Sequence, residues 1–432
     1  MHFIDRPTSH DRLGFQPYVE GIEDMLRQII SRHELPSAIG IYGAWGSGKT
    51  SFMMQLRDRL MKEMPHSKPI PTIWFDAWKY DRKQDVRSGL IYSILIELHD
   101  KARRSTKAKI TNAIKTGGKF SALLVTQSQL SLGIPVAGMT IPSIEQLAKK
   151  ITDNEQEFYT IVDKYTNVFA GAVKAFLDQY TEEETKALVV FIDDLDRCLP
   201  ENVIIILEAL KLFLENAPCI FVIGVDRTVV EKAVRVHYRD DPGIYGREYL
   251  DKIIQHQFTL PPADKDRVES LFFNEPGSDR LDDKCLAILH QAADGNPRMY
   301  LRMFNALRLV LSLAEHINPK LCVGTGKHWL TLATATSIRF PSLHELCGRM
   351  TEGLPTFMDY CANPQEPKHA EGLQTRGVDY LSFWKDGCTR QFFSGICKLG
   401  FRNTKYRETE LMKAAFNLSC RVKTVTEVSE IS

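Results

Sequence analysis

Gly43-Ala44-Trp45-Gly46-Ser47-Gly48-Lys49-Thr50 is the stretch that decides the fold, because it fits the pattern G-x-x-x-x-G-K-[ST]. An apolar run at 37–43 (SAIGIYG) precedes it, and residues 50–64 place apolar side chains at a helical spacing. A glycine-rich loop between a strand and a helix binds phosphate, because its backbone N–H groups and the helix N-terminus point at the anion. We predict that Lys49 reaches the β- and γ-phosphates and that Thr50 binds Mg²⁺. The predicted nucleotide contacts are Gly43, Ala44, Trp45, Gly46, Ser47, Gly48, Lys49, Thr50 and Ser51.

A second chemical signal lies at 189–194, where VVFIDD is an apolar strand that ends in two carboxylates. Beside a phosphate loop, the first carboxylate, Asp193, is predicted to bind the Mg²⁺ that accompanies the nucleotide. The second, Asp194, is predicted to polarise the attacking water. A second acid at this place favours hydrolysis over transfer to a small acceptor.

The alternation of strands and helices predicts the fold class. Further strands are expected at 72–78, 219–226 and 253–260, with helices at 88–99, 201–216 and 228–238 between them. This order predicts an α/β fold with a parallel sheet of at least five strands, helices on both faces, and a ligand at the carboxyl ends of the strands. Pro261 and Pro262 end that core, and helical spacing then runs from 264 to about 316.

Composition excludes several classes of protein. The chain has 432 residues, of which 44% are hydrophobic and 25% charged, as in an ordinary globular protein. Its 55 Lys and Arg against 54 Asp and Glu argue against a generally basic nucleic-acid coat or an acidic disordered chain. Nine cysteines without a CxxC pair argue against a disulfide scaffold. The polar N-terminal segment has no secretion signal, so a cytoplasmic location is expected.

Six segments in one order carry a resemblance to a known family. They are GAWGSGKTS (43–51), FDAWKYD (75–81), VVFIDDLDRC (189–198), VIGVDR (222–227), REYLDKIIQHQFTLPP (247–262) and GNPRMYLRMFNAL (295–307). From about residue 14 to about 345 the chain resembles the KAP family of P-loop NTPases. The resemblance implies a P-loop NTPase sheet flanked by helices, with an extra strand between the two nucleotide-binding strands, then a helical lid and a small C-terminal region. It also implies ATP hydrolysis coupled to a conformational switch.

We therefore expect three parts of the chain. Residues 14–262 form the P-loop NTPase core with an insertion at about 101–180, residues 263–345 form the lid, and residues 346–432 form a C-terminal region with no predicted role.

Two arginines complete the predicted catalytic set with Lys49 and Asp194. Arg227 follows Asp226 at the end of the strand expected beside 189–194, where related ATPases keep a polar sensor of the γ-phosphate. Arg298 begins a helix of the lid and resembles the second sensor of such ATPases. A surface salt bridge is the alternative role for Arg298.

Other residues near these motifs keep two interpretations each. Trp74, Trp78 and Tyr80 belong either to the core or to a nucleotide-sensing loop. Asp196 and Arg197 form either a local ion pair or a pair that orients the site.

The insertion carries a doubtful apolar segment and a basic run. Residues 120–141 are marginal for a membrane span. A single span would also place Lys49 and Asp193 on opposite sides of a membrane, so no stable insertion is expected. The run 101–119 has seven basic residues and no acid, which fits a solvated helix face or a contact with nucleic acid or anionic lipid.

The favoured function is Mg²⁺-dependent ATP hydrolysis as a switch, in bacterial anti-phage defence by analogy with some KAP proteins. A separately encoded effector protein is the expected partner, and a homo-oligomer is left open. One alternative is an ATP-dependent nucleic-acid factor of the loader or initiator type that uses 101–119. Another is a nucleotide-gated scaffold with hardly any turnover.

Overall fold

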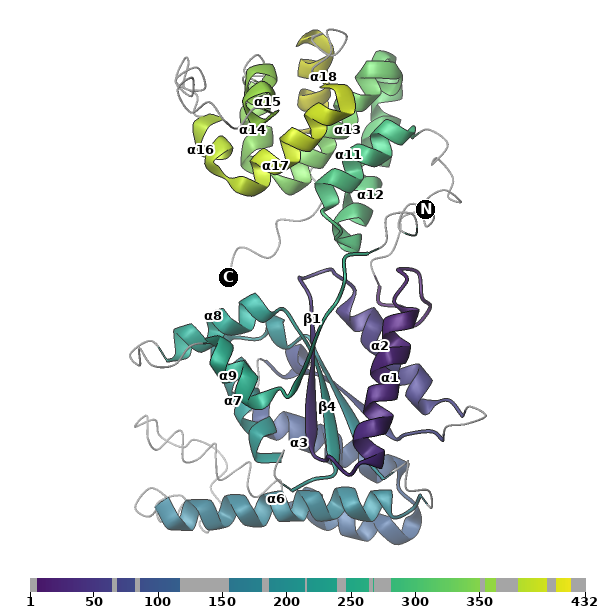
Figure 1. Cartoon of the computed structure of the whole chain (residues 1–432), viewed down its shortest axis with the longest axis vertical. Helices are drawn as coiled ribbons and strands as arrows, with labels where there is room; N and C mark the ends of the chain where they lie inside the picture. Colours follow the sequence, from purple (N-terminus) through teal and green to yellow (C-terminus); the bar gives the residue numbers. More distant parts are fainter. Residues whose placement is uncertain are drawn as a thin grey trace. The chain divides into compact units, whose positions relative to one another are not determined.

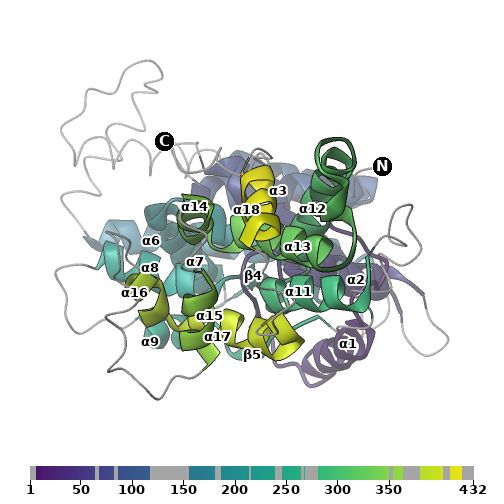
Figure 2. The same cartoon turned by 90° about the horizontal axis from the view of Figure 1, so that it is seen from above.

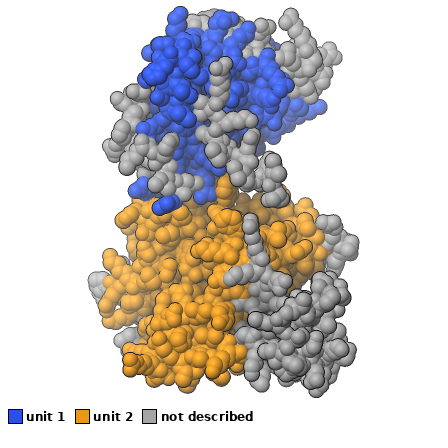
Figure 3. All heavy atoms as spheres, turned by 180° about the vertical axis from the view of Figure 1, so that it is seen from behind, with its two compact units in different colours: residues 1–6, 12–14, 262–432 blue, residues 7–11, 15–261 orange. Residues whose placement is uncertain are grey.

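A computed structural model describes most of the chain and divides it into two compact units (Figure 3). One unit, the core, holds residues 7–11 and 15–261, and the other, the helical unit, holds 1–6, 12–14 and 262–432. The described residues are 6–63, 68–81, 86–116, 155–180, 186–213, 216–238, 246–263, 267, 281–349, 354–362, 380–401 and 409–420.

The core is built on a five-stranded sheet in the order β2-β3-β4-β1-β5, in which every pairing is parallel (Figure 1). All five strands coincide with predicted ones, which confirms the α/β fold class. β4 separates β1, which precedes the glycine-rich loop, from β3, which ends in Asp193. The strands are β1 Ser37–Tyr42, β2 Thr72–Asp76, β3 Leu188–Asp193, β4 Cys219–Val225 and β5 His256–Thr259.

Helices cover both faces of the sheet, as the alternation of buried side chains requires. Val190 and Ile192 of β3 belong to the hydrophobic cluster that α3, α6, α7, α8 and α9 share with the sheet. Phe191 alternates with them and stacks on Trp74, over which Arg57 of α2 lies, so the other face of the sheet is the side of α2, against which α1 packs. The helices of the core are α1 Gln16–Ser31, α2 Lys49–Met61, η1 Ala77–Tyr80, α3 Val86–Lys101, α6 Glu155–Leu177, η3 Leu195–Arg197, α7 Pro200–Phe213, α8 Arg227–His237 and α9 Gly246–Ile253.

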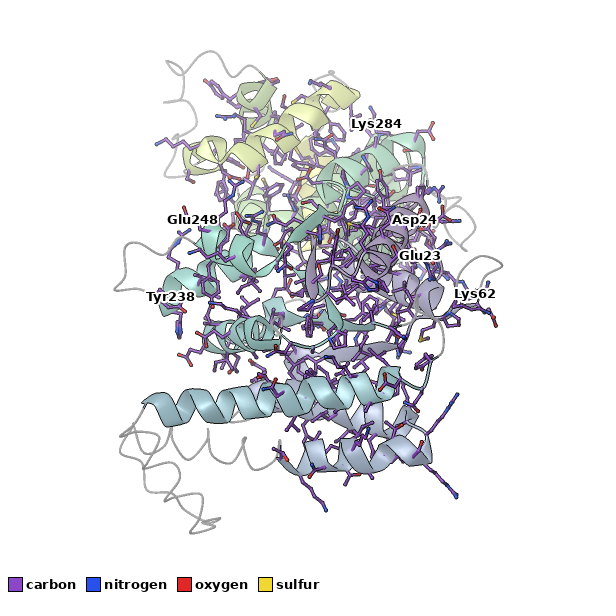
Figure 4. All side chains as sticks on the ribbon, turned by 60° about the horizontal axis from the view of Figure 1, so that its bottom comes forward. Glu23, Asp24, Lys62, Tyr238, Glu248 and Lys284 are labelled. Carbon is purple, nitrogen blue, oxygen red and sulfur yellow. The ribbon has the colours of Figure 1, made fainter. Side chains whose placement is uncertain are left out.

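A buried charge joins α1 to α2. The Glu23 carboxylate, labelled in Figure 4, is 5% exposed and pairs with Arg59 Nε at 2.6 Å and Arg27 at 3.0 Å. Glu20 of α1 adds a more exposed pair with Arg59 at 3.2 Å. Because α2 begins at the glycine-rich loop, this pairing contributes to holding that helix against its neighbour.

The described parts of the predicted insertion pack on the core. Residues 104–116 are helical, and Ile110 lies in the same hydrophobic cluster as Phe169 of α6. Most basic side chains of this helix are exposed, as on a solvated helix face, and a contact with nucleic acid stays a prediction. The apolar segment 120–141 lies outside the described residues. Among the described helices, none has the length and apolar character that crossing a bilayer requires.

The helical unit has one hydrophobic core of its own, to which helices from both the predicted lid and the predicted C-terminal region contribute. α13 packs against α11, α12 and α18 in this core (Figure 2). The division at residue 345 stays a prediction, although both sides of it share this packing. The elements are α11 Asp283–Ala293, α12 Pro297–Ile317, η5 Pro319–Cys322, α13 Gly324–Arg339, α14 Pro341–Arg349, α15 Leu354–Ala362, α16 Tyr380–Lys385, α17 Gly387–Ile396, η8 Cys397–Phe401 and α18 Thr409–Ser419.

Two polar contacts tie helices of this unit together. Asp282 caps α11 and its carboxylate also contacts Lys327 Nζ (2.9 Å) and His328 Nε2 (3.0 Å) of α13. His344 of α14 forms a 2.7 Å hydrogen bond through Nε2 with Ser419 Oγ of α18. Burial lowers the pKa of His344 to about 4, so the imidazole is neutral near pH 7.

Candidate functional site

The glycine-rich loop runs from the end of β1 into α2 (Figure 1). Gly46 (φ 84°) and Gly48 (φ 102°) adopt left-handed backbone conformations that other residues rarely take. Among the described residues no side chain caps α2, so its first N–H groups have no side-chain acceptor there. The Ser47 hydroxyl is buried and has no hydrogen-bond partner in the described part of the chain. A loop with unused donors at a helix N-terminus suits a phosphate group.

Lys49 is the cation of this loop and is only 8% exposed. Its Nζ donates to the carbonyl oxygens of Gly43 (2.9 Å) and Ala44 (3.4 Å). It also forms an ion pair with Asp196 Oδ2 at 3.1 Å. The structure therefore brings the predicted phosphate ligand Lys49 next to the acidic end of β3.

Thr50 and Asp193, the two predicted Mg²⁺ ligands, lie in contact. Thr50 Oγ1 donates a 3.2 Å hydrogen bond to Asp193 Oδ1. Burial, together with the negative charge of Asp194, raises the pKa of Asp193 to about 6, although the Thr50 hydrogen bond opposes the shift. The Thr50 hydroxyl and the buried Asp193 carboxylate are hard oxygen donors, which fit Mg²⁺.

Asp194 lies just beyond β3 in the left-handed region (φ 56°), which an aspartate tolerates better than most residues. Its Oδ1 pairs with Arg197 Nε at 3.0 Å, and its side chain is 19% exposed. Burial raises the pKa of Asp194, the Arg197 guanidinium opposes this, and the charges of Asp76 and Asp196 add to it. A half-buried carboxylate beside the predicted metal ligand can accept a proton from a water molecule.

Asp196 and Arg197 pair with other residues rather than with each other, and a role in orienting the site stays a prediction. Arg197 pairs with Asp194, whereas Asp196 pairs with Lys49. Both residues therefore contact predicted site residues.

The aromatic residues around β2 differ in how far they are buried, and a nucleotide-sensing role stays a prediction. Trp74 stacks on Phe191 (5.5 Å between centroids) and Tyr80 stacks on Phe75 (5.0 Å), so these two pack. Core packing is wrong for Trp78, which is 53% exposed and lies under the Arg197 guanidinium at 5.5 Å.

Asp76 was not singled out from the sequence as a site residue. It ends β2 opposite Asp193 in the strand register and pairs with Lys79 at 3.0 Å. A signal was available, because an aspartate ends the strand that neighbours β3.

Arg227 begins α8, just beyond β4, as predicted. Its guanidinium donates to Glu231 (2.8 Å), Gln257 (2.9 Å) and Asp251 (3.3 Å), and it lies over the Tyr42 ring. These contacts engage the guanidinium within the core, and a sensor role for Arg227 stays a prediction. Arg298 is the second residue of α12 in the helical unit, and its predicted role also stays a prediction.

A parallel sheet with a phosphate-type loop after β1 and a paired acid at the end of β3 defines a P-loop NTPase. The KAP family P-loop domain matches residues 15–314, more than half of the chain. The chain belongs to the KAP family.

Two relatives have been found by sequence. The Phage T7 exclusion protein of Escherichia coli (strain K12) is 24% identical over 330 residues, which are 69% of this chain and 41% of that protein. The chain thus spans about two fifths of that relative's length. An uncharacterized protein of Methanocaldococcus jannaschii is 28% identical over 163 residues, which are 32% of this chain and 81% of that protein.

The solved structures to which the chain is similar include two proteins of Aeropyrum pernix. The ORC1 protein in complex with DNA has a TM-score of 0.35 at 12% identity, covering 90% of this chain and 83% of that one. The ORC2 protein, in ADPNP–ADP complexes, has a TM-score of 0.34 at 12% identity, covering 94% of each chain.

Proposed function

We propose that the chain hydrolyses ATP with Mg²⁺ and uses the reaction as a conformational switch. The observation that supports this most is the convergence of Lys49, Thr50 and Asp193 at the carboxyl ends of β1 and β3, with Thr50 Oγ1 and Asp193 Oδ1 3.2 Å apart. A phosphate-directed cation and two oxygen ligands for a hard cation are what a Mg²⁺–nucleotide complex requires.

The residues of the chain have distinct roles in this proposal. Lys49 and the N–H groups at the start of α2 bind the phosphates, while Thr50 and Asp193 bind the metal. When bound, Mg²⁺ neutralises charge on the β- and γ-phosphates. Asp194 orients the attacking water and accepts its proton, and Arg197 holds the Asp194 carboxylate in place through the 3.0 Å pair. Arg227 and Arg298 sense the γ-phosphate.

The test of this function is Lys49→Ala. Removing the cation should abolish ATP binding or reduce turnover to background, because the loop keeps its backbone donors but loses its phosphate-directed charge. Thr8→Ala is a matched control, since Thr8 lies in the core and donates its backbone N–H to Ser51 Oγ without contacting Lys49 through its side chain. Phosphate release and equilibrium ATP binding are measured on both. A Lys49→Ala protein that hydrolyses ATP at the parental rate contradicts the proposed function.

We further propose a role in bacterial defence against phage, in the cytoplasm and with a separately encoded effector. The support is that the relative with 69% coverage of this chain is a phage exclusion protein. Phage T7 plating efficiency is compared on cells expressing the chain, with its neighbouring genes, or its Lys49→Ala variant. Protection that needs Lys49 supports the role, and equal plaque counts with both proteins contradict it.

A further inference from the structure

We infer that Asp196 is a positioning residue that occupies the phosphate-binding donor of Lys49 when no nucleotide is bound. The Asp196 side chain is 4% exposed and its Oδ2 lies 3.1 Å from Lys49 Nζ. A carboxylate in this place is an internal anion that competes with the nucleotide phosphates for the same ammonium group. This inference rests on the proposed binding of nucleotide at residues 43–51.

The donors of Lys49 are all in use. A lysine ammonium has three N–H donors, and Nζ has three acceptors: the carbonyl oxygens of Gly43 and Ala44, at 2.9 and 3.4 Å, and Asp196 Oδ2, at 3.1 Å. A phosphate oxygen must replace one of them. The carbonyls belong to the loop that surrounds the phosphates, so the acceptor that gives way is the carboxylate, which carries the same sign of charge as the phosphate.

Asp196 is held in this place by a second contact. The backbone N–H of Asp226 donates a 2.8 Å hydrogen bond to Asp196 Oδ2, the same oxygen that faces Lys49. Asp226 in turn caps α8, because its Oδ1 accepts from the Thr228 N–H at 3.0 Å. The carboxylate therefore lies between the loop cation and the turn from β4 to α8, and it keeps a partner when Lys49 turns to a phosphate.

Nucleotide binding must separate Lys49 from Asp196, which costs free energy, and one substitution removes this cost. Asp196→Asn is nearly isosteric, and its amide oxygen still accepts from Asp226, but it loses the charge that attracts Lys49. We expect Mg·ATP and Mg·ADP to bind about tenfold more tightly to Asp196→Asn, the size of one charge-assisted hydrogen bond. A residue that merely supported the fold would weaken binding when changed.

The first experiment measures equilibrium affinities of a ribose-labelled fluorescent ATP and ADP with Mg²⁺. Glu97→Gln is the matched control, because Glu97 is an ion-paired acid of the core that contacts Lys101 at 2.6 Å within α3, outside the candidate site. Its effect on affinity is expected to be less than about threefold, since only long-range charge changes. Unchanged or weaker binding by Asp196→Asn overturns the inference, and so does equal tightening by Glu97→Gln. Lys49→Ala tests the proposed function separately. If this variant keeps the parental affinity for nucleotide, the proposed function fails, whatever Asp196→Asn does.

A second experiment needs no nucleotide. The urea midpoint of unfolding is measured for Lys49→Met, Asp196→Asn and the double variant. Asp196→Asn should lower the midpoint in the parental protein but leave it unchanged or raise it in the Lys49→Met background, since the buried carboxylate has lost its cation there. Equal shifts of the urea midpoint in both backgrounds would show that Lys49 and Asp196 do not interact, which overturns the inference. If Asp196→Asn alone does not fold, the double variant with Lys49→Met decides. If the double variant folds, the result supports an interaction between Lys49 and Asp196, and if it does not fold, the result overturns that interaction.

Discussion

Replacing Asp194 by asparagine should separate nucleotide binding from hydrolysis. Asparagine also tolerates the left-handed conformation of this position (φ 56°), so the turn from β3 into η3 is kept. What is lost is the negative charge that pairs with Arg197 at 3.0 Å and the basicity that accepts a proton from water. The Thr50–Asp193 contact that we assign to the metal is unaffected.

The two effects have different sizes and opposite signs. Loss of a positioned proton acceptor lowers turnover by about 10²-fold or more, which corresponds to a rise in activation free energy of about 2.7 kcal/mol. The affinity of this variant for Mg·ATP should not fall. The charge of Asp194 contributes to the raised pKa of Asp193, so its removal favours the ionised, metal-binding form of Asp193. Affinity for Mg·ATP should therefore stay equal or increase.

The assay pairs equilibrium Mg·ATP affinity with single-turnover hydrolysis for Asp194→Asn and Asp193→Asn. Asp193→Asn removes a predicted metal ligand and should weaken binding and chemistry together. Asp194→Asn should hold ATP without cleaving it. Parental single-turnover rates in Asp194→Asn would refute the assignment of the base, and a loss of affinity as large as that of Asp193→Asn would refute the separation of roles.

Two predictions concern stability, each measured by urea unfolding. Glu23→Gln should lower the free energy of unfolding by about 2 kcal/mol, less than for a fully buried pair, because Arg27 and Arg59 stay partly hydrated. Glu20→Gln is the control: the Glu20 carboxylate is 44% exposed, so its loss should cost less than about 0.5 kcal/mol. Equal losses in the two variants would refute the argument from burial. His344 takes up a proton only near pH 4 when folded but near its ordinary value of 6.5 when unfolded, so stability falls as the pH falls below about 6.5. His344→Gln should lose about 2 kcal/mol less than the parental protein between pH 7 and pH 5, and identical losses would contradict the burial argument.

The sequence predicted the fold where local patterns determine it. Apolar runs such as 37–43 and 219–226 have no competing interpretation once a glycine-rich loop and short helices separate them, and all five strands follow. The contact between Thr50 and Asp193 was also predictable, because parallel strands bring their carboxyl ends to one edge.

The sequence did not predict the contacts that depend on the direction of a side chain in a short turn. Asp196 could pair with its neighbour Arg197 or reach further, and after the left-handed turn at Asp194 it pairs with Lys49. Trp78 has the size of a core residue, yet η1 directs it to the surface. Spacing likewise does not show that helices on either side of residue 345 share one core, since each helix alone is simply amphipathic.

The pairing of β5 with β1 gives the core a short mechanical connection to the chain that follows. The Leu260 N–H donates a 2.8 Å hydrogen bond to the carbonyl of Tyr42, the residue directly before Gly43. Pro261 and Pro262 come next, and the helical unit begins at Pro262. Proline rings lock φ and restrict the residue before them, so the backbone at Pro261 and Pro262 has few accessible conformations. One backbone hydrogen bond therefore links the residue before the glycine-rich loop to the residue before the two prolines.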